Sequence, residues 1–155
     1  MGFKISALRV DQFTKLFSMT DSELEQYNAR RLIVDANPGF PCRVSLQDAE
    51  IGETVLLMNY VHHNHNTPYL ASHAIFVREN ARQAEPLRDI IPDVLKSRLI
   101  SVRGFNDSHD MINAEVVDGH SLRHVINNFF DDKDINYLHL HNAKPGCYAA
   151  RVNRA

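Results

Sequence analysis

The chain has 155 residues, of which 44% are hydrophobic and 23% are charged, and its formal net charge is −2. A chain of this length buries about two-thirds of the surface that its unfolded form exposes, so it can fold without a disulfide. The composition is close to the globular average, which argues against long disordered arms. Lysine and arginine are scattered along the chain, so we expect no nucleic-acid partner and no membrane partner.

The first eight residues lack the charged start, long apolar segment and small-residue cleavage site of a signal peptide. No apolar run in the sequence approaches the length that spans a membrane. We therefore expect a cytoplasmic protein. Thiols are kept reduced in that compartment, so Cys42 and Cys147 are expected to be free.

The N-terminal part alternates between strand and helix signals. Residues 3–8 alternate as in a strand. Apolar residues then recur at helical spacing, at Val10, Phe13, Leu16 and Phe17. Residues 20–23 form a Thr-Asp-Ser-Glu capping box, which predicts a second short helix. A short β-like run at residues 31–35 is ended by the Asn-Pro-Gly turn at 37–39.

Residues 42–46 alternate in polarity, which predicts a short strand. Because side chains alternate along a strand, Cys42, Val44 and Leu46 are expected on one face. We expect that apolar face to be buried and Arg43 to lie on the opposite face.

The following segments predict a buried strand and then a long loop. Residues 54–58 are apolar without interruption, which is typical of a strand covered on both faces at the centre of a sheet. The polar stretch 59–72 contains His62, His63 and His65. It predicts a long solvated loop, and loops of that length often carry function.

The C-terminal half gives the clearest signals. Pro92 favours the first turn of a short helix at residues 93–97. Residues 99–105 and 111–117 predict an antiparallel hairpin. An amphipathic helix follows, capped by Asp118 or Ser121, with apolar residues at Leu122, Val125, Ile126, Phe129 and Phe130.

Strands outnumber helices in this pattern, and the turns between them are short. The sequence therefore predicts an α+β fold in a single domain over residues 1–155, with a largely antiparallel sheet. A few short helices and one longer amphipathic helix near the C-terminus complete the expected fold.

The most chemically varied residues lie in a predicted terminal hairpin. Strand-like runs at 137–141 and 147–151 flank the turn residues 142–146. A five-residue loop gives three cross-strand pairs, His141–Cys147, His139–Ala149 and Tyr137–Arg151. Two histidines, a cysteine, an arginine and a tyrosine then share one face. A loop one residue shorter would move Cys147 to the opposite, leucine-bearing face.

Cys147, His141 and His139 are the candidate catalytic residues. A thiol beside an imidazole and a guanidinium favours the thiolate, so one interpretation is nucleophilic or redox chemistry at Cys147 with His141 as base or ion-pair partner. In the alternative, Cys147 is a small hydrophobic residue packed in a terminal strand, which is the common state of a free cysteine.

The His-x-His pair at His139 and His141 also suits zinc or iron, with Cys147, Cys42 or a loop histidine as a further ligand. No Cys-x-x-Cys motif, no His-Glu-x-x-His motif and no carboxylate at a diagnostic offset supports such a site, so no metal is assigned. Nucleotide-binding glycine motifs and the serine-hydrolase elbow are absent as well, and the cofactor stays unknown.

Two arginines follow Pro/Gly turns, Arg43 in the first half of the chain and Arg151 in the last strand. Together with the hydroxyl of Tyr137 and free turn N–H groups, they are candidates for binding a small anionic ligand, a carboxylate or a phosphate. The alternative is that they pair with neighbouring carboxylates such as Asp35 or Glu115.

Two stretches carry a family resemblance, residues 35–53 (DANPGFPCRVSLQDAEIGE) and residues 139–152 (HLHNAKPGCYAARV). They resemble a family of small bacterial proteins that is filed only as a domain of unknown function. The likeness extends over most of the chain, from the first strand to Arg154. It implies a bacterial cytosolic protein and a whole-domain unit, and it assigns no activity, substrate or catalytic residue.

Two hypotheses about function arise from these observations. In the first, the protein binds a small ligand or catalyses a reaction on the polar face of the terminal hairpin, roofed by the loop at residues 59–72. In the second, it is a non-enzymatic interaction module, in one form a homodimer joined through an exposed sheet face or edge.

Overall fold

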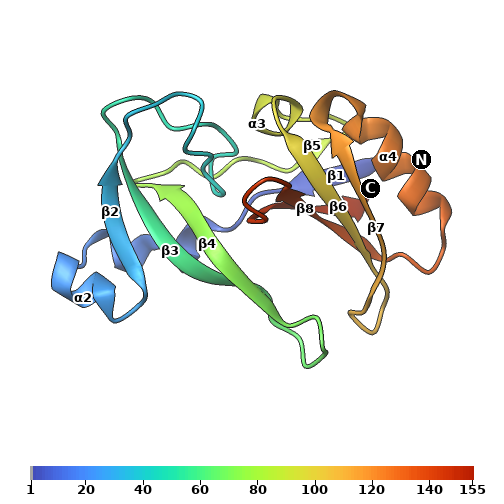
Figure 1. Ribbon diagram of the computed structural model, residues 1–155, viewed down its shortest axis with the longest axis horizontal. Coiled ribbons are helices and arrows are strands. Elements are labelled where there is room, and N and C mark those ends of the chain that lie inside the picture. The colour runs from blue at the N-terminus through green and yellow to red at the C-terminus, as the bar shows by residue number, and fades with distance from the viewer. Residues whose placement is uncertain (1) are drawn as a thin grey trace.

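The computed structural model describes residues 2–155. Its nine strands form two antiparallel sheets, which stand on either side of the molecule in Figure 1. The smaller sheet has the order β2-β3-β4, with β2 at Ala29–Ile33, β3 at Thr54–His63 and β4 at Ala71–Arg78. Short helices and antiparallel sheets agree with the predicted α+β class, although one sheet was expected and two are found.

The larger sheet has the order β5-β1-β9-β8-β6-β7. Its strands are β1 Phe3–Ser6, β5 Leu87–Arg88, β6 Leu99–Phe105, β7 Met111–Asp118, β8 Tyr137–Asn142 and β9 Tyr148–Arg154. The first strand of the chain, β1, therefore lies between β5 and the last strand, β9. The β6–β7 hairpin is present as predicted.

Short helical turns and one longer helix complete the described chain. They are η1 Val10–Gln12, α1 Thr14–Phe17, α2 Asp21–Glu25, α3 Asp93–Lys96, η2 Gly119–Ser121 and α4 Leu122–Asp131, of which α4 has 10 residues. The N-cap half of the predicted capping box is confirmed, because the Thr20 hydroxyl accepts from the Glu23 N–H at 3.2 Å. The Glu23 carboxylate accepts from the Thr20 hydroxyl at 3.1 Å.

Helix α4 covers one face of the larger sheet (Figure 1). All five of its predicted apolar positions are buried, and they pack with Leu138, Leu140, Ala150 and Val152 of β8 and β9. Full burial of one such side chain contributes about 1.5–3 kcal/mol, so this face anchors the sheet. The Asp118 carboxylate caps η2, the turn that precedes α4, by accepting from the His120 N–H.

The turn before α4 depends on close backbone packing at Gly119. A Cβ atom built there would overlap the Leu95 carbonyl oxygen and lie 2.7 Å from the Lys96 Cα. We expect Gly119→Ala to lower the free energy of unfolding by about 2 kcal/mol, because backbone atoms cannot give way as side chains do. Urea denaturation measures this loss. Gly39→Ala is the control, since its nearest neighbour would lie at 3.5 Å, and equal stabilities for the two variants would contradict the prediction.

The smaller sheet packs against the N-terminal helical turns. Its buried residues Leu56, Ile75 and Val77 form one cluster with Phe13 of the η1–α1 junction and Leu24 of α2. β3 is the central strand of this sheet rather than of one large sheet. The predicted cover on both faces is only partly present, because Val55 and Leu56 are buried whereas Leu57 and Met58 are half-buried.

Residues 42–46 do not form the predicted strand. They make a tight turn closed by a hydrogen bond from the Leu46 N–H to the Cys42 carbonyl oxygen, with Leu46 at φ +53°. Cys42, Val44 and Leu46 are buried as expected. Arg43 is buried too, with 2% of its surface exposed, because a turn does not separate alternate residues onto two faces.

The predicted long loop at residues 59–72 is also corrected. β3 continues to His63, and β4 begins at Ala71, so the connection is much shorter. The polar residues belong to a strand: Tyr60 pairs with His73 and Val61 with Ser72. These polar residues lie at the end of a strand that has one solvent-facing face. Hydrophobic periodicity does not distinguish such a strand end from a loop.

The terminal hairpin forms, but its predicted register is wrong. Leu140 pairs with Ala150 and His141 pairs with Tyr148, so Ala149 is an extra residue in a β-bulge. His139 therefore lies opposite Arg151, and Cys147 falls outside the strand pairing. The register differs because of this bulge and not because of the shorter loop considered as the alternative, since residues 142–147 lie between the paired residues His141 and Tyr148.

Candidate functional site

Aromatic and histidine side chains line the face of β8 that looks away from α4. Tyr137, His139 and His141 are buried there, while the intervening Leu138 and Leu140 belong to the core beneath. His141 is 1% exposed and His139 3% exposed, values that are unusual for titratable side chains. In Figure 1 this face of β8 lies toward β3 and β4 of the smaller sheet.

A β-bulge at the end of β3 brings two consecutive histidines to this face. Val61 pairs with Ser72 but His63 pairs with Ala71, so His62 is the extra residue. The His62 ring lies 4.8 Å from the His141 ring and stacks on Tyr148 at 5.5 Å. The His63 ring lies 5.5 Å from the His139 ring. In a regular strand the two side chains would point to opposite faces.

Histidines from the tips of two hairpins lie close to one another beside this face. His63 and His65 come from the β3–β4 hairpin and His109 from the β6–β7 turn, and their ligand nitrogens all lie within 4.8 Å of one another. We call these three residues the three-histidine group. The His65 and His109 rings are stacked, with centroids 3.5 Å apart. His109 has φ +64°, a left-handed conformation that places its side chain at the turn.

The hydroxyl of Tyr137 contacts two members of the three-histidine group. It is 3.0 Å from His63 Nε2 and 2.8 Å from His109 Nδ1. The Tyr69 carbonyl oxygen, 3.0 Å from His63 Nδ1, can only accept, so Nδ1 carries the proton and Nε2 of neutral His63 keeps its lone pair. A ring that donates its second N–H to a backbone carbonyl is the usual arrangement of a metal-binding histidine.

The electrostatic environment favours the neutral form of four histidines in and beside this group, His62, His63, His65 and His141. Burial lowers the pKa of His63 and of His65, and the neighbouring His109 lowers both further. Burial likewise lowers the pKa of His62 to about 4 and that of His141 to about 3. Neutral imidazole is the form that binds metals, so the lowered pKa values of His63 and His65 favour metal binding.

A second layer of histidines lies behind the three-histidine group. His62 Nδ1, His139 Nδ1 and His141 Nε2 are buried nitrogens with no hydrogen-bond partner within residues 2–155. The other nitrogen of His141, Nδ1, lies 2.9 Å from the Gly146 carbonyl oxygen and donates to it. Buried polar atoms are usually paired, so unpaired nitrogens mark a polar interior suited to ligands or water.

The predicted site residues are only partly brought together. Tyr137, His139, His141 and Arg151 share one face, and the Arg151 guanidinium lies 3.9 Å from the centre of the Tyr137 ring. Cys147 is not among them. Because of the bulge at Ala149, its Sγ faces Arg43 and Asn142 instead, and the predicted His141–Cys147 pair is wrong.

Arg43 and Cys147 contact each other outside the histidine-lined face of β8. The Arg43 Nε donates to the Tyr148 carbonyl oxygen at 2.7 Å, Nη2 donates to Cys147 Sγ at 2.8 Å, and Nη1 donates to the Pro41 carbonyl oxygen. Pairing of Arg43 with Asp35 or of Arg151 with Glu115 is not found in the described part of the chain. Burial lowers the pKa of Arg43, an effect that the two cysteines oppose.

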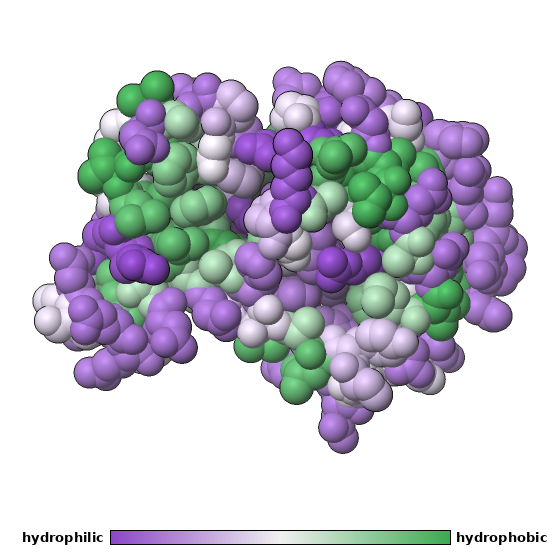
Figure 2. Space-filling model, viewed as in Figure 1, coloured by the Kyte–Doolittle hydropathy of each residue, from purple (hydrophilic) through white to green (hydrophobic). Residues whose placement is uncertain are grey.

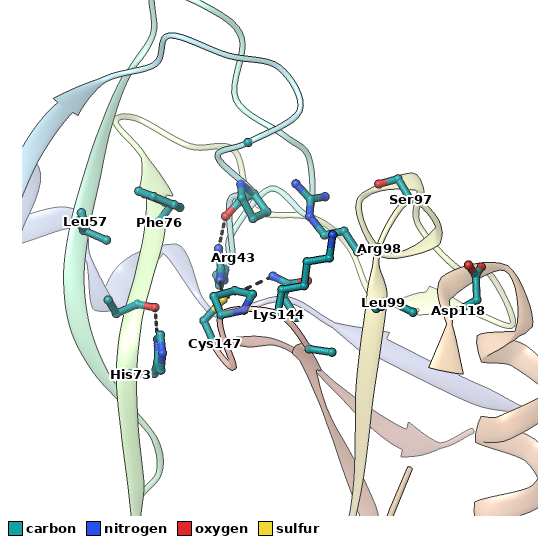
Figure 3. A pocket seen from close by; sticks show the side chains of 16 residues that line it. Arg43, Leu57, His73, Phe76, Ser97, Arg98, Leu99, Asp118, Lys144 and Cys147 are labelled. Atoms are coloured by element: carbon teal, nitrogen blue, oxygen red, sulfur yellow. Dashed lines mark hydrogen bonds between the residues drawn. The ribbon is translucent and has the colours of Figure 1, made fainter. Parts of the chain in front are cut away.

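A pocket of about 600 Å³ opens beside this arginine, between the two sheets. Figure 3 shows Leu57, His73 and Phe76 on one side, Ser97, Leu99 and Asp118 on the other, and Arg43 and Cys147 between them. Figure 2 shows hydrophobic surface over both sheets with hydrophilic residues between them. The volume is typical of small-molecule sites.

Comparison with known proteins shows the family. A family model described as a protein of unknown function, DUF1203, matches residues 39–154. The chain belongs to this family. The matched range includes both the three-histidine group and the pocket beside Arg43. No curated protein and no solved structure matches the chain. None of the helices within residues 2–155 is both long and apolar enough to span a membrane.

Sequence reasoning missed His109 and misplaced His62 and His63. Nothing in the sequence indicates that His109 belongs to a site. It lies in a predicted hairpin turn, and a local pattern does not show which other turns lie near that turn in the fold. The run of histidines at 62, 63 and 65 was a usable signal. The pattern predicts a solvated loop, because a bulge turns two adjacent side chains to the same face and leaves no mark on a period-two pattern.

Proposed function

We propose that the protein binds one transition-metal ion, with zinc as the best-fitting ion, through His63, His65 and His109. The observation that carries this proposal is the convergence of three imidazoles within 4.8 Å. Imidazole suits zinc, copper, iron and nickel, and the absence of carboxylate from the set disfavours magnesium and calcium. Rotation of the His65 and His109 rings out of their stack aims both lone pairs at one ion, and both rings are only half-buried.

Three protein ligands leave a fourth position for water or substrate, which is typical of catalytic rather than structural zinc sites. Zinc bound in this way would lower the pKa of a bound water to about 7, and the site would then support addition of water to a polar substrate. The Tyr137 hydroxyl, in contact with two of the three ligands, would be placed to hold such a water by a hydrogen bond.

The other predicted residues take supporting roles in this proposal. His139 and His141 form the buried wall behind the three-histidine group, and Arg151 holds the Tyr137 ring by a cation–π contact. We propose His139, His141, Tyr137 and Arg151 as residues of the site. Cys147 and Arg43 belong to the separate pocket.

The test is an equilibrium titration of untagged, chelator-treated protein with zinc, in competition with a chromophoric chelator. We expect one zinc ion per chain for the wild type and an affinity at least about 100-fold lower for His63→Ala, since a protein ligand is lost. His124→Ala is the matched control, because His124 is exposed on α4. Equal zinc affinity for all three proteins, or none in the wild type, would reject the proposal.

The interaction module is the second candidate, and one observation favours it. β7 is an edge strand of the larger sheet and bears exposed Val116, at 60%, and Ile112, at 44%. An apolar edge of this kind favours pairing with a second copy of the chain. Light scattering over a range of concentrations measures the mass, and a monomer throughout would reject the homodimer.

We further propose a bacterial, cytoplasmic protein. The family resemblance supports the bacterial origin. The two cysteines are both free and both buried, which is consistent with a reducing compartment and supports the cytoplasmic location.

A further inference from the structure

The pocket beside Arg43 is separate from the three-histidine group. None of His63, His65, His109 and Tyr137 lines it, whereas Arg43, Asn142 and Cys147 do. It lies between the sheets, with walls from β3 and β4 on one side and from the start of β6 on the other (Figure 3). Binding of a ligand in this pocket therefore does not depend on the metal proposal.

The charge of the pocket favours an anion. Arg43, Arg98 and Lys144 line it, against a single carboxylate among the described lining residues, Asp118. The Arg98 guanidinium is already paired with Asp48 at 2.6 Å, but Arg43 and Lys144 make no ion pair with a carboxylate of the described chain. A buried cation without a counter-ion is costly, and an anionic ligand would offset that cost.

Arg43 can serve a ligand without losing its present contacts. A guanidinium has five N–H donors. Three of them are used, on Tyr148, Pro41 and Cys147. The remaining donors suit a carboxylate, for which a fixed guanidinium is the preferred partner.

Asn142 adds a second requirement that the ligand of this pocket has to meet. Its side chain is buried, with 5% of the residue exposed, and lines the pocket. Its Nδ2 donates to Cys147 Sγ at 3.6 Å, whereas its Oδ1 has no donor within residues 2–155. Because a buried acceptor is costly when unpaired, the fitting ligand supplies an O–H or N–H group at this point.

The remaining walls are apolar. Leu57, Phe76, Leu99 and Pro145 contribute side chains to the lining, and Leu57, Phe76 and Leu99 are seen on the two sides in Figure 3. These surfaces accept a hydrocarbon body of moderate size, because the pocket holds about 600 Å³. Inorganic phosphate or sulfate would leave them uncovered.

We infer that this pocket binds a small organic acid that carries a hydroxyl or amino group next to its carboxylate. Arg43 and Lys144 take the carboxylate, Asn142 Oδ1 takes the neighbouring donor, and the apolar walls take the hydrocarbon part. The Cys147 thiol lies between the two recognition groups, so bound ligand covers it.

Calorimetry with mandelate as the probe tests this inference on chelator-treated protein. We expect mandelate to bind, and both mandelamide, which lacks the charge, and phenylacetate, which lacks the hydroxyl, to bind at least about tenfold more weakly. Phenyl phosphate distinguishes a carboxylate site from a general anion site. Equal binding of mandelate and mandelamide, tighter binding of phenyl phosphate, or no binding of mandelate would overturn the inference.

Two variants of pocket residues test whether mandelate binds in this pocket. Lys144→Gln and Asn142→Ala are each expected to weaken mandelate binding about tenfold, while Lys133→Gln, an exposed lysine after α4, leaves it unchanged. Arg43 is not replaced, because it also holds the fold. Unchanged binding in both pocket variants would overturn the inference, as would binding that appears only after zinc is restored.

A second measurement uses the thiol. In the Cys42→Ser background, Cys147 is the single cysteine, and neutral iodoacetamide reports its accessibility through the pocket. Saturating mandelate is expected to slow its alkylation at least about tenfold, whereas mandelamide at the same concentration is not. Equal rates with and without mandelate would place the ligand elsewhere and overturn the assignment.

Discussion

Arg43→Met is expected to lower the free energy of unfolding by about 3 kcal/mol. Methionine keeps most of the side-chain volume but cannot donate to the Tyr148 and Pro41 carbonyl oxygens or to Cys147 Sγ. Loss of a buried donor costs about 1–3 kcal/mol for each acceptor left unpaired. Removing a buried cation recovers part of that cost, so the net loss is smaller than the sum.

Two comparisons make this expectation specific. Arg43→Lys keeps the charge but has no planar fork, so it is expected to lose most of the same stability. Arg82→Met, at an exposed position, is expected to change the free energy of unfolding by less than about 0.5 kcal/mol. Urea denaturation of the four proteins gives these values. An Arg43→Met variant as stable as the wild type would show that the three hydrogen bonds do not support the fold.

Acid is expected to unfold the metal-free protein through its buried histidines, with His141 as the clearest case. Burial lowers the pKa of His141 to about 3, and the ordinary value is 6.5. The unfolded chain takes up a proton as the pH falls through 6.5, whereas folded His141 does not until about pH 3. This group therefore costs no stability above pH 6.5 and lowers it by about 1.4 kcal/mol for each pH unit below that value.

The surroundings of His141 come from four other strands, and its own strand contributes another histidine. The titratable and charged groups that face it are His62, His73, Arg103, His139 and Tyr148. The positive charge of Arg103 opposes protonation, and so would a proton on a neighbouring imidazole. The Gly146 carbonyl, which accepts from Nδ1, favours protonation and only partly offsets burial.

The measurement is the free energy of unfolding between about pH 7.5 and 4.5 with a chelator present, over a range set by the ordinary histidine pKa. His141→Asn keeps a donor near the Nδ1 position and removes the titration, so its stability is expected to fall less steeply, by about 1.4 kcal/mol per pH unit. Ile126→Val is the control, since it lowers stability without a titratable group. Parallel curves for wild type and His141→Asn would contradict the assignment.

Periodic elements could be predicted from the sequence, because their signals are local. The apolar positions of α4, the capping box at Thr20 and the β6–β7 hairpin each depend on residues close together in the chain. The division into two sheets could not be predicted, because strand partners are chosen by packing between distant segments. For example, β1 pairs with β9, which no local pattern indicates.

The candidate site was predicted in part for the same reason. Alternation correctly placed Tyr137, His139 and His141 on one face of β8. Single extra residues at His62 and Ala149 then changed which neighbours that face meets. A bulge is a local change of twist and pairing with no composition of its own, so the loss of Cys147 from this face and the gain of His62 and His63 were not visible in the sequence.

The position of β1 between β5 and β9 has a consequence for synthesis of the chain. The smaller sheet uses residues 29–78 and can pair its strands as soon as they have been made. β1 must wait for β9, about 150 residues later, so one of its edges stays unpaired until β9 has been made. The buried wall of His139 and His141 depends on β9 as well, so the site cannot be assembled before that strand has been made.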